Sequence, residues 1–214
     1  MKHVQKFAVF LAAVLQAGLG MTRVSGASPD SNDKEPWEFT LTMDGYIVPN
    51  QDGYVSPAFA ADRGWLHLEA RYDYENLRTG SVWTGYNIST GKDLTFSVTP
   101  MIGAVFGKTT GLAPGCEAAL SYKKIELSVS NEFVFAPSKL SSSFYFAWPQ
   151  LTYSALSWLR IGLVAQRTKA YHTSLDTQRG LFVGFTHKKM ELTTYVFNAG
   201  WTQPTVVLEV GVGF

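Results

Sequence analysis

The feature that most constrains this chain is a period-two alternation of apolar and polar residues, which recurs in short segments after residue 36. One face of the segment 37–44 carries only apolar side chains: Trp37, Phe39, Leu41 and Met43. The other face carries polar ones: Glu38, Thr40, Thr42 and Asp44. Successive side chains of a β-strand point to opposite faces. The pattern therefore predicts strands with one apolar and one polar face, and no long helical period interrupts them.

The last ten residues repeat this pattern and end on an aromatic side chain. Counting back in twos gives an apolar set: Phe214, Val212, Val210, Leu208 and Val206. A final aromatic residue closing such a strand resembles the C-terminal signal of bacterial outer-membrane β-barrels, which their assembly machinery reads. The resemblance covers residues 205–214. It implies an all-β fold, a closed antiparallel transmembrane β-barrel, with the barrel-assembly machinery and outer-membrane lipid as partners.

The first residues read as an export signal. Lys2 and Lys6 precede an apolar run over residues 7–19, which is shorter than the roughly twenty apolar residues that a transmembrane helix needs. Small residues up to Ala27 suit signal peptidase. We therefore expect a signal peptide over 1–27, a flexible periplasmic lead-in over 28–36 and an outer-membrane barrel over 37–214 of a Gram-negative bacterium. An uncleaved membrane anchor is the alternative.

A single cysteine, Cys116, limits covalent cross-linking. One cysteine cannot form an internal disulfide. Its distance from residue 27 also argues against a lipid anchor on the mature N-terminus.

Turn-forming clusters divide the barrel into about twelve strands, with ten or fourteen as alternatives. The predicted strands run over 37–48, 54–60, 65–74, 81–88, 93–106, 116–122, 125–135, 143–153, 158–168, 178–186, 190–197 and 205–214. An even count places the tight turns on the periplasmic side and the longer loops outside. Aromatic residues near the periplasmic strand ends would form a girdle: Trp37, Tyr86, Tyr122, Tyr153, Trp158 and Phe214. Pro100 and Pro149 fall inside strands, where we expect bulges or local strand ends because proline donates no hydrogen bond.

Composition agrees with a membrane barrel and excludes several other classes. Hydrophobic residues make up 46% of the chain and aromatic residues 14%, while the mean hydropathy is close to zero. In membrane barrels apolar residues alternate with polar ones along each strand, so a mean hydropathy near zero is expected. The net charge of +1 gives no support for nucleic-acid binding. Neither paired cysteines for zinc nor a glycine-rich phosphate loop is present, so we expect no cofactor and no metal.

The predicted inner face of the barrel is acidic. Its carboxylates are Glu38, Asp44, Glu69, Asp73, Glu117, Glu126, Glu132, Glu191 and Glu209. Its cations are fewer: Arg71, Lys123 and Arg160, with His67 joining at low pH. Buried charges are costly unless they are paired or hydrated. Either ion pairs fill a narrow interior, or the lumen is wet and its charges select what passes.

We select eight pore-lining candidates: Glu69, Arg71, Asp73, Glu126, Glu132, Arg160, Glu191 and Glu209. The leading hypothesis is a small passive channel for hydrophilic solutes, with cations favoured by the acidic excess. Small, short-looped channels for acidic oligosaccharides are similar in architecture. Such a channel needs arginine side chains in its lumen to attract acidic solutes, whereas the predicted lumen here is acidic. The sequence does not indicate which solute passes or the oligomeric state.

Three other hypotheses remain open. The first is a filled barrel with a structural or binding role. The second is a lipid-modifying enzyme, because His172 and Ser174 stand two apart as in the His-x-Ser of lipid A deacylases. A third orienting residue is not evident, so we expect no enzymatic activity. The last is a soluble β-sandwich, which the apolar faces argue against.

Overall fold

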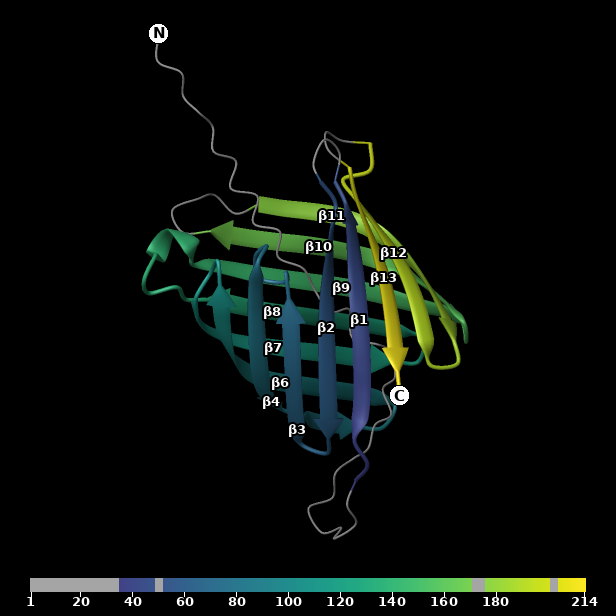
Figure 1. Ribbon diagram of the computed structural model, residues 1–214. Helices are drawn as coiled ribbons and strands as arrows, with labels where there is room; N and C mark the ends of the chain where they lie inside the picture. The colour runs from purple at the N-terminus through teal and green to yellow at the C-terminus, as the bar shows by residue number, and fades with distance from the viewer. Residues whose placement is uncertain (1–34, 49–51, 171–175, 201–203) are drawn as a thin grey trace.

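Thirteen antiparallel strands form one sheet that closes on itself (Figure 1). The computed structural model describes residues 35–48, 52–170, 176–200 and 204–214. The predicted signal peptide and most of the lead-in lie outside these ranges. The strands are β1 (Glu38–Ile47), β2 (Tyr54–Arg63), β3 (Leu66–Tyr72), β4 (Thr79–Tyr86), β5 (Ile88–Gly91), β6 (Leu94–Gly107), β7 (Gly111–Tyr122), β8 (Ile125–Val134), β9 (Phe144–Leu156), β10 (Leu159–Ala170), β11 (Asp176–His187), β12 (Met190–Phe197) and β13 (Thr205–Gly213).

The first and last strands close the barrel. β1 pairs with β2 on one side and with β13 on the other. The remaining strands pair with their sequence neighbours, except that β4 and β5 do not pair with each other and both pair with β6. At the seam the Phe39 amide donates to the Phe214 carbonyl at 3.2 Å, and the Phe214 amide donates back to Phe39 at 3.0 Å. The last residue therefore completes the ring of backbone hydrogen bonds.

β4 and β5 are two parts of one barrel strand. Both pair with β6 in the same register, since Gly85 faces Met101 and Ile88 faces Val98. The interruption falls opposite Pro100, which has no amide hydrogen to donate. Counting β4 and β5 together gives a twelve-strand barrel, which confirms the predicted fold and strand number.

Neither proline interrupts its own strand. β6 runs through Pro100 without a break, and the local strand end lies in its partner. At Pro149, the β9–β10 ladder lacks pairs between Gln150–Val164 and Ala147–Arg167 but keeps its register. The register shift in this hairpin lies at Leu159–Arg160. The expected bulge or local strand end is therefore wrong at Pro149, because β9 continues through it in one register.

Several predicted boundaries need correction. β2 runs on to Arg63 and β9 to Leu156, so the turns predicted at 61–64 and 154–157 are shorter than expected. β7 begins at Gly111 and not at residue 116, because the alternation continues upstream with Leu112 outside and Ala113 buried. Residues 88–91 form β5, although 89–92 was predicted as a turn. The only helical segment of the described residues is a 3-10 turn at Leu140–Ser142. No helix in these ranges is long and apolar enough to cross a membrane.

The outer surface of the barrel is apolar. Four leucines in register, one on each strand from β8 to β11, form a continuous outer row: Leu127, Leu151, Leu163 and Leu181. Their exposed fractions lie between 43% and 60%. The six aromatic residues of the predicted girdle are exposed as well. An apolar outer surface of this extent is typical of barrels that span a membrane.

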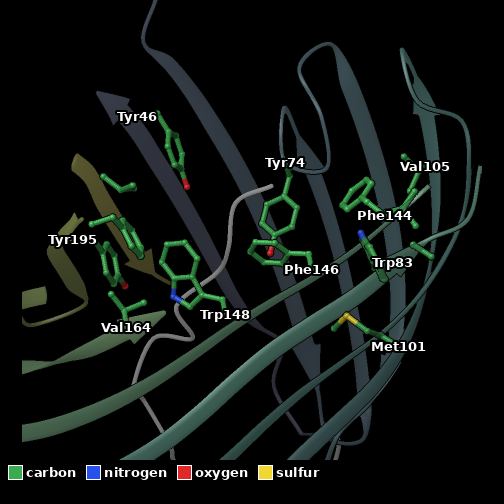
Figure 2. Packing of buried hydrophobic residues seen from close by; sticks show 14 of the residues in the cluster. Tyr46, Tyr74, Trp83, Met101, Val105, Phe144, Phe146, Trp148, Val164 and Tyr195 are labelled. Atoms are coloured by element: carbon green, nitrogen blue, oxygen red, sulfur yellow. The ribbon is translucent and has the colours of Figure 1, made fainter. Parts of the chain in front are cut away.

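The inner face holds the buried residues. Polar and charged side chains share this face with a cluster of buried aromatic and aliphatic side chains, which Figure 2 shows. The aromatic members are Tyr46, Tyr74, Trp83, Phe144, Phe146, Trp148, Phe182, Tyr195 and Phe197. The functional groups of the protein therefore converge inside the barrel.

Candidate functional site in the barrel interior

Arg71 on β3 is the centre of the larger charged cluster. Its guanidinium donates to Glu69 at 2.5 Å and to Glu132 at 3.0 Å. All three side chains are buried. Arg71 and Glu69 are two residues apart, so alternation places both on the inner face. Glu132 comes from β8, and β4, β6 and β7 lie between β3 and β8. The ion pair therefore crosses the interior.

Two aromatic rings enclose the same guanidinium. The guanidinium carbon lies 4.2 Å from the ring centroid of Tyr74 and 4.6 Å from that of Trp83. Such cation–π contacts hold a guanidinium in one orientation. Trp83 fits because Gly103 opposite it on β6 has no side chain, and a Cβ there would come within 2.5 Å of the indole.

The β3–β4 loop, residues 73–78, folds into the barrel. Tyr74 is 1% exposed and Glu75 is fully buried. The Glu75 carboxylate accepts hydrogen bonds from Ser81 at 2.5 Å and from the Trp83 indole at 3.3 Å. Burial raises the pKa of Glu75, and the nearby Arg71 charge opposes that rise. The loop thereby adds a carboxyl and a phenol to the interior.

Asp73 shapes this loop and does not lie on a strand. Its backbone φ is 54°, and its carboxylate accepts a hydrogen bond from the Arg78 amide at 2.5 Å. Arg78 has a φ of 58°. Left-handed conformations at both ends allow the chain to turn inward and return. The structure gives Asp73 a turn-forming position, in place of the strand position assumed for it as a lining residue.

A second hydrogen-bond network lies near the tight turns. His67 Nδ1 is 2.8 Å from Asp62 Oδ1, and the Asn87 amide donates to the same oxygen at 2.8 Å. Thr99 donates to Asn87 at 2.7 Å. The described residues contain no group of three or more His, Cys, Asp or Glu side chains that could hold a metal.

The opposite side of the interior carries a second group of charged residues. Arg160 on β10 pairs with Glu191 on β12 and donates to the Thr193 hydroxyl at 3.2 Å. On the adjoining strands, Asp44 of β1 faces Glu209 of β13 directly. Both are 3% exposed. Two like-charged residues are thus neighbours on one inner face.

Aromatic contacts cross the interior as well. The Trp148 ring on β9 lies 5.4 Å from Tyr195 and 5.1 Å from Phe197, both on β12. Two strands, β10 and β11, lie between β9 and β12. Figure 2 shows Trp148 and Tyr195 facing each other inside the barrel. This contact and the Arg71–Glu132 pair each join distant parts of the barrel wall.

Most predicted lining residues lie on the inner face. Five are buried there: Glu69, Arg71, Glu132, Glu191 and Glu209. Arg160 and Glu126 are half-buried, and Glu126 accepts a hydrogen bond from Ser121 at 2.8 Å. Glu38 and Lys123 are exposed at the end with the tight turns, so they do not join the interior charges.

Sequence reasoning missed the inward loop. It placed Tyr74 at a strand end and Glu75 in an outer loop. A loop between two short strands has no period that reveals which way it folds. The His172 and Ser174 pair lies outside the described residues.

Comparisons with known proteins find the fold but no sequence relative. No protein-family profile and no curated protein matches this sequence. A solved structure described as KdgM porin in complex with disordered oligogalacturonate is 13% identical, with a TM-score of 0.62, covering 82% of this chain and 99% of that one. A second KdgM porin structure is 12% identical with a TM-score of 0.59 and the same coverage. Omp33 of Acinetobacter baumannii is 11% identical with a TM-score of 0.48, covering 83% of this chain and 98% of that one.

The closed twelve-strand barrel, apolar outside and charged inside, has the fold of outer-membrane porins. This confirms, at the level of the fold, the resemblance predicted from the last strand. The fold also agrees with the expected location in the bacterial outer membrane.

Proposed function

We propose that this protein is a small passive channel for hydrophilic solutes in the outer membrane. The observation that carries the proposal is the contrast between the two faces of the barrel. The outer face presents apolar side chains. The inner face buries six carboxylates: Asp44, Glu69, Glu75, Glu132, Glu191 and Glu209. Such an interior is suited to water and polar solutes.

Unsatisfied polar atoms favour a hydrated interior. Eleven buried side-chain nitrogen or oxygen atoms have no hydrogen-bond partner among the described residues, including atoms of Asp44, Glu69, Arg71 and Glu132. A buried polar atom that meets neither protein nor water costs about 1–3 kcal/mol. Water that reaches these atoms removes that cost, and an interior open to water is open to small solutes.

The passage would run along one side of the barrel. Long side chains from β3, β8, β9 and β12 meet in the two cross-barrel contacts. By contrast, the inner face of β13, β1 and β2 carries mainly short side chains: Thr42, Ser56, Ala58, Ala60 and Gly211. We name this face the β13–β1–β2 wall. Glu209 lies on the wall. Glu69 and Arg71 lie on the neighbouring strand β3 and Glu191 on the neighbouring strand β12, whereas Glu132 lies across the interior on β8.

Charge supports a preference for cations or neutral solutes. The six buried carboxylates are accompanied by the buried guanidinium of Arg71, the buried imidazole of His67 and, on the opposite side of the interior, the half-buried guanidinium of Arg160. One matching structure holds oligogalacturonate, which carries carboxylate groups. An anion of that kind would be repelled by the interior described here.

A filled barrel with a structural or binding role is the second candidate. The cross-barrel contacts of Arg71–Glu132 and Trp148–Phe197, together with the inward loop, favour it because they narrow the interior. We propose no enzymatic activity. Lipid around the apolar surface and the barrel-assembly machinery at the last strand are the proposed partners in the membrane.

Single-channel recording tests the proposal. The folded protein is inserted into a planar bilayer, and the reversal potential is measured in a salt gradient. Steady conductance with cation preference supports a hydrated acidic lumen. Protein that migrates as folded on a detergent gel but conducts no ions would favour the filled barrel. Anion preference would contradict the assigned role of the carboxylates.

A further inference from the structure

The outer wall of β10 and β11 carries two arginines on a face that is otherwise apolar. Arg167 follows the same alternation as Leu163 on β10, and Arg179 follows that of Leu181 on β11. The two leucines are 55% and 60% exposed, and both arginines are exposed as well. Away from the tight turns, the other outward side chains whose exposure the structure describes are uncharged. Contact with acyl chains alone does not account for two charges on this wall.

Neither guanidinium has a carboxylate partner among the described residues. The ion pairs of these ranges are made by His67, Arg71 and Arg160, which belong to the inner face. Asp176 on β11 follows the alternation of the buried Phe182 and is therefore also at an inner position. The connecting segments 171–175 and 201–203 contain neither Asp nor Glu. A counter-charge for the two arginines therefore comes from outside the protein.

The arginines lie near the outer edge of the membrane-facing band. From Trp158, just before β10, to Arg167 the chain rises by roughly 23 Å if the strand tilts by about 40°. The apolar band of an outer-membrane barrel is about 25 Å tall, and Trp158 belongs to the girdle at its inner edge. Arg167 thus reaches the level of the lipid headgroups, and the long side chain of Arg179 can extend to the same level. The anions available there are those of lipid headgroups.

The register brings the two side chains close enough to share one anion. β10 and β11 are neighbours in the sheet (Figure 1). Arg167 is opposite Thr177, and Arg179 is two residues further along β11. Such diagonal neighbours on one face are about 7–8 Å apart. Guanidinium groups bind phosphate in a planar, bidentate geometry and are less strongly hydrated than ammonium groups. One phosphate group between the two residues can therefore accept hydrogen bonds from both.

We infer that Arg167 and Arg179 form a binding site on the outer wall for lipid A, the phosphorylated lipid of the outer leaflet. The arginines hold a phosphate group of the lipid, and its acyl chains follow the leucine row toward the membrane centre. Asn131 and Thr177, in line with Arg167 across β8–β11, offer hydrogen bonds to the sugar hydroxyls. The site lies at the strand ends with the longer loops, which are expected outside the membrane. It lies outside the lumen, so the inference goes beyond the proposed channel.

Two other occupants fit this wall less well. A second copy of the chain would present an outer wall whose described side chains, away from the tight turns, include no carboxylate. It would therefore supply no counter-charge. A phospholipid of the inner leaflet would meet the opposite ends of the same strands, where the tight turns lie.

Native mass spectrometry of the folded protein in detergent tests the site without requiring conduction. Lipid A, dephosphorylated lipid A and phosphatidylglycerol are titrated separately. We expect lipid A to bind most tightly, and Arg167→Gln/Arg179→Gln to weaken its Kd by at least about tenfold, because two charge-assisted contacts are lost. Lys108→Gln/Lys139→Gln is the matched control. It removes the same charge from exposed positions in the outer loops and should leave Kd unchanged.

Several results would overturn the site. They are equal Kd values for the wild type and the glutamine variant, an equal loss of affinity in the lysine control, and no lipid A binding to the wild type. Dephosphorylated lipid A or phosphatidylglycerol binding as tightly as lipid A would overturn lipid A as the occupant. A lipid-free dimer that the glutamine variant abolishes would assign the arginines to a contact between copies instead.

Folding of each variant is checked by heat-dependent gel migration. If the glutamine variant does not fold, Arg167→Lys/Arg179→Lys gives the comparison. It keeps both charges but loses the planar guanidinium geometry, so it should still weaken the Kd for lipid A several-fold. A lysine variant that binds lipid A as tightly as the wild type would then overturn the site.

Discussion

Arg71 and Glu132 form an ion pair of 3.0 Å across the barrel interior, although three strands separate them in the sheet. Arg71 also pairs with Glu69. One guanidinium therefore serves two buried carboxylates and joins two walls that the backbone hydrogen bonds do not connect directly.

Removing Arg71 should destabilise the barrel strongly. Arg71→Met leaves Glu69 and Glu132 without their cation, and breaking a buried ion pair in this way costs roughly 3–5 kcal/mol, with hydration of the interior favouring the lower figure. Denaturant unfolding in detergent micelles, followed by intrinsic fluorescence, measures the change. Glu132→Gln keeps the Arg71–Glu69 pair and should cost clearly less. Equal losses for the two variants would contradict a central role for Arg71.

The fit of Trp83 against Gly103 offers a second test. A Cβ at Gly103 would lie 2.5 Å from the indole, so Gly103→Ala forces Trp83 away from Arg71. Overpacking of this kind costs about 1–3 kcal/mol. Gly45→Ala is the control, because its Cβ would meet only the Leu208 carbonyl at 3.7 Å. The same unfolding assay should separate the two variants, and equal stability would show that Trp83 relaxes freely.

Period-two alternation predicted the fold because every strand of the barrel has one apolar and one polar face, and this property is visible within each short segment of sequence. Each strand must show one face to lipid and the other to the interior, so strands such as Met190–Phe197 were predicted at their observed bounds. The same rule placed Glu69, Arg71 and Glu191 on the inner face. Turn residues and parity then gave the number of strands.

The features that the sequence did not predict depend on contacts between residues that are distant in the sheet or in the loops. The Arg71–Glu132 and Trp148–Phe197 contacts need the closed ring, and a sequence pattern does not reveal which residues meet across it. The inward loop is a second case, since Tyr74 and Glu75 are held by Arg71, Ser81 and Trp83. Pro100 is a third, because its missing donor interrupts the partner strand and not its own.

Glu75 should make the inward loop sensitive to pH. Burial raises its pKa above the ordinary value of 4.5, so the packed loop favours the protonated carboxyl. This contribution is complete below pH 4.5 and is lost as the pH rises through the raised pKa. The charges that face it are Arg71, which opposes the shift, and Glu132.

Because the loop lies inside the barrel, a change in its packing should change the single-channel conductance. We expect a lower or noisier current at acid pH, increasing as the pH rises above 4.5, and Glu75→Gln should hold the low-pH behaviour at all pH values. Recording wild type and variant between pH 4 and 8, a range set by the ordinary carboxyl pKa, checks it. An identical pH profile for both proteins would assign the titration to other carboxyls.

The leucine row on the outer surface tests insertion in a membrane. Leu163 is 55% exposed at the middle of the row. An arginine at a lipid-facing position near the bilayer centre costs roughly 2–4 kcal/mol. Leu163→Arg should therefore lower the free energy of unfolding from lipid vesicles by that amount. Leu140→Arg is the control, because Leu140 is similarly exposed, at 46%, but lies in an outer loop. Two equally mild effects would mean that the row does not face lipid.

Variants of Phe214 can separate two roles of this residue: closing the β1–β13 seam in the folded barrel, and being recognised by the assembly machinery. Its ring stacks on Phe39 with centroids 5.8 Å apart, and its backbone closes the seam whatever the side chain. Phe214→Ala should therefore cost only the stacking, about 0.5–1.5 kcal/mol, and should still refold in detergent. If the assembly machinery reads the final aromatic ring, the same variant should reach the outer membrane at a several-fold lower level, while Phe214→Tyr keeps both stability and level. Comparing heat-shifted protein in membrane fractions with refolding yields measures the two effects separately. A fall in membrane level no larger than the loss of stability would remove the need for recognition and leave Phe214 as a seam residue alone.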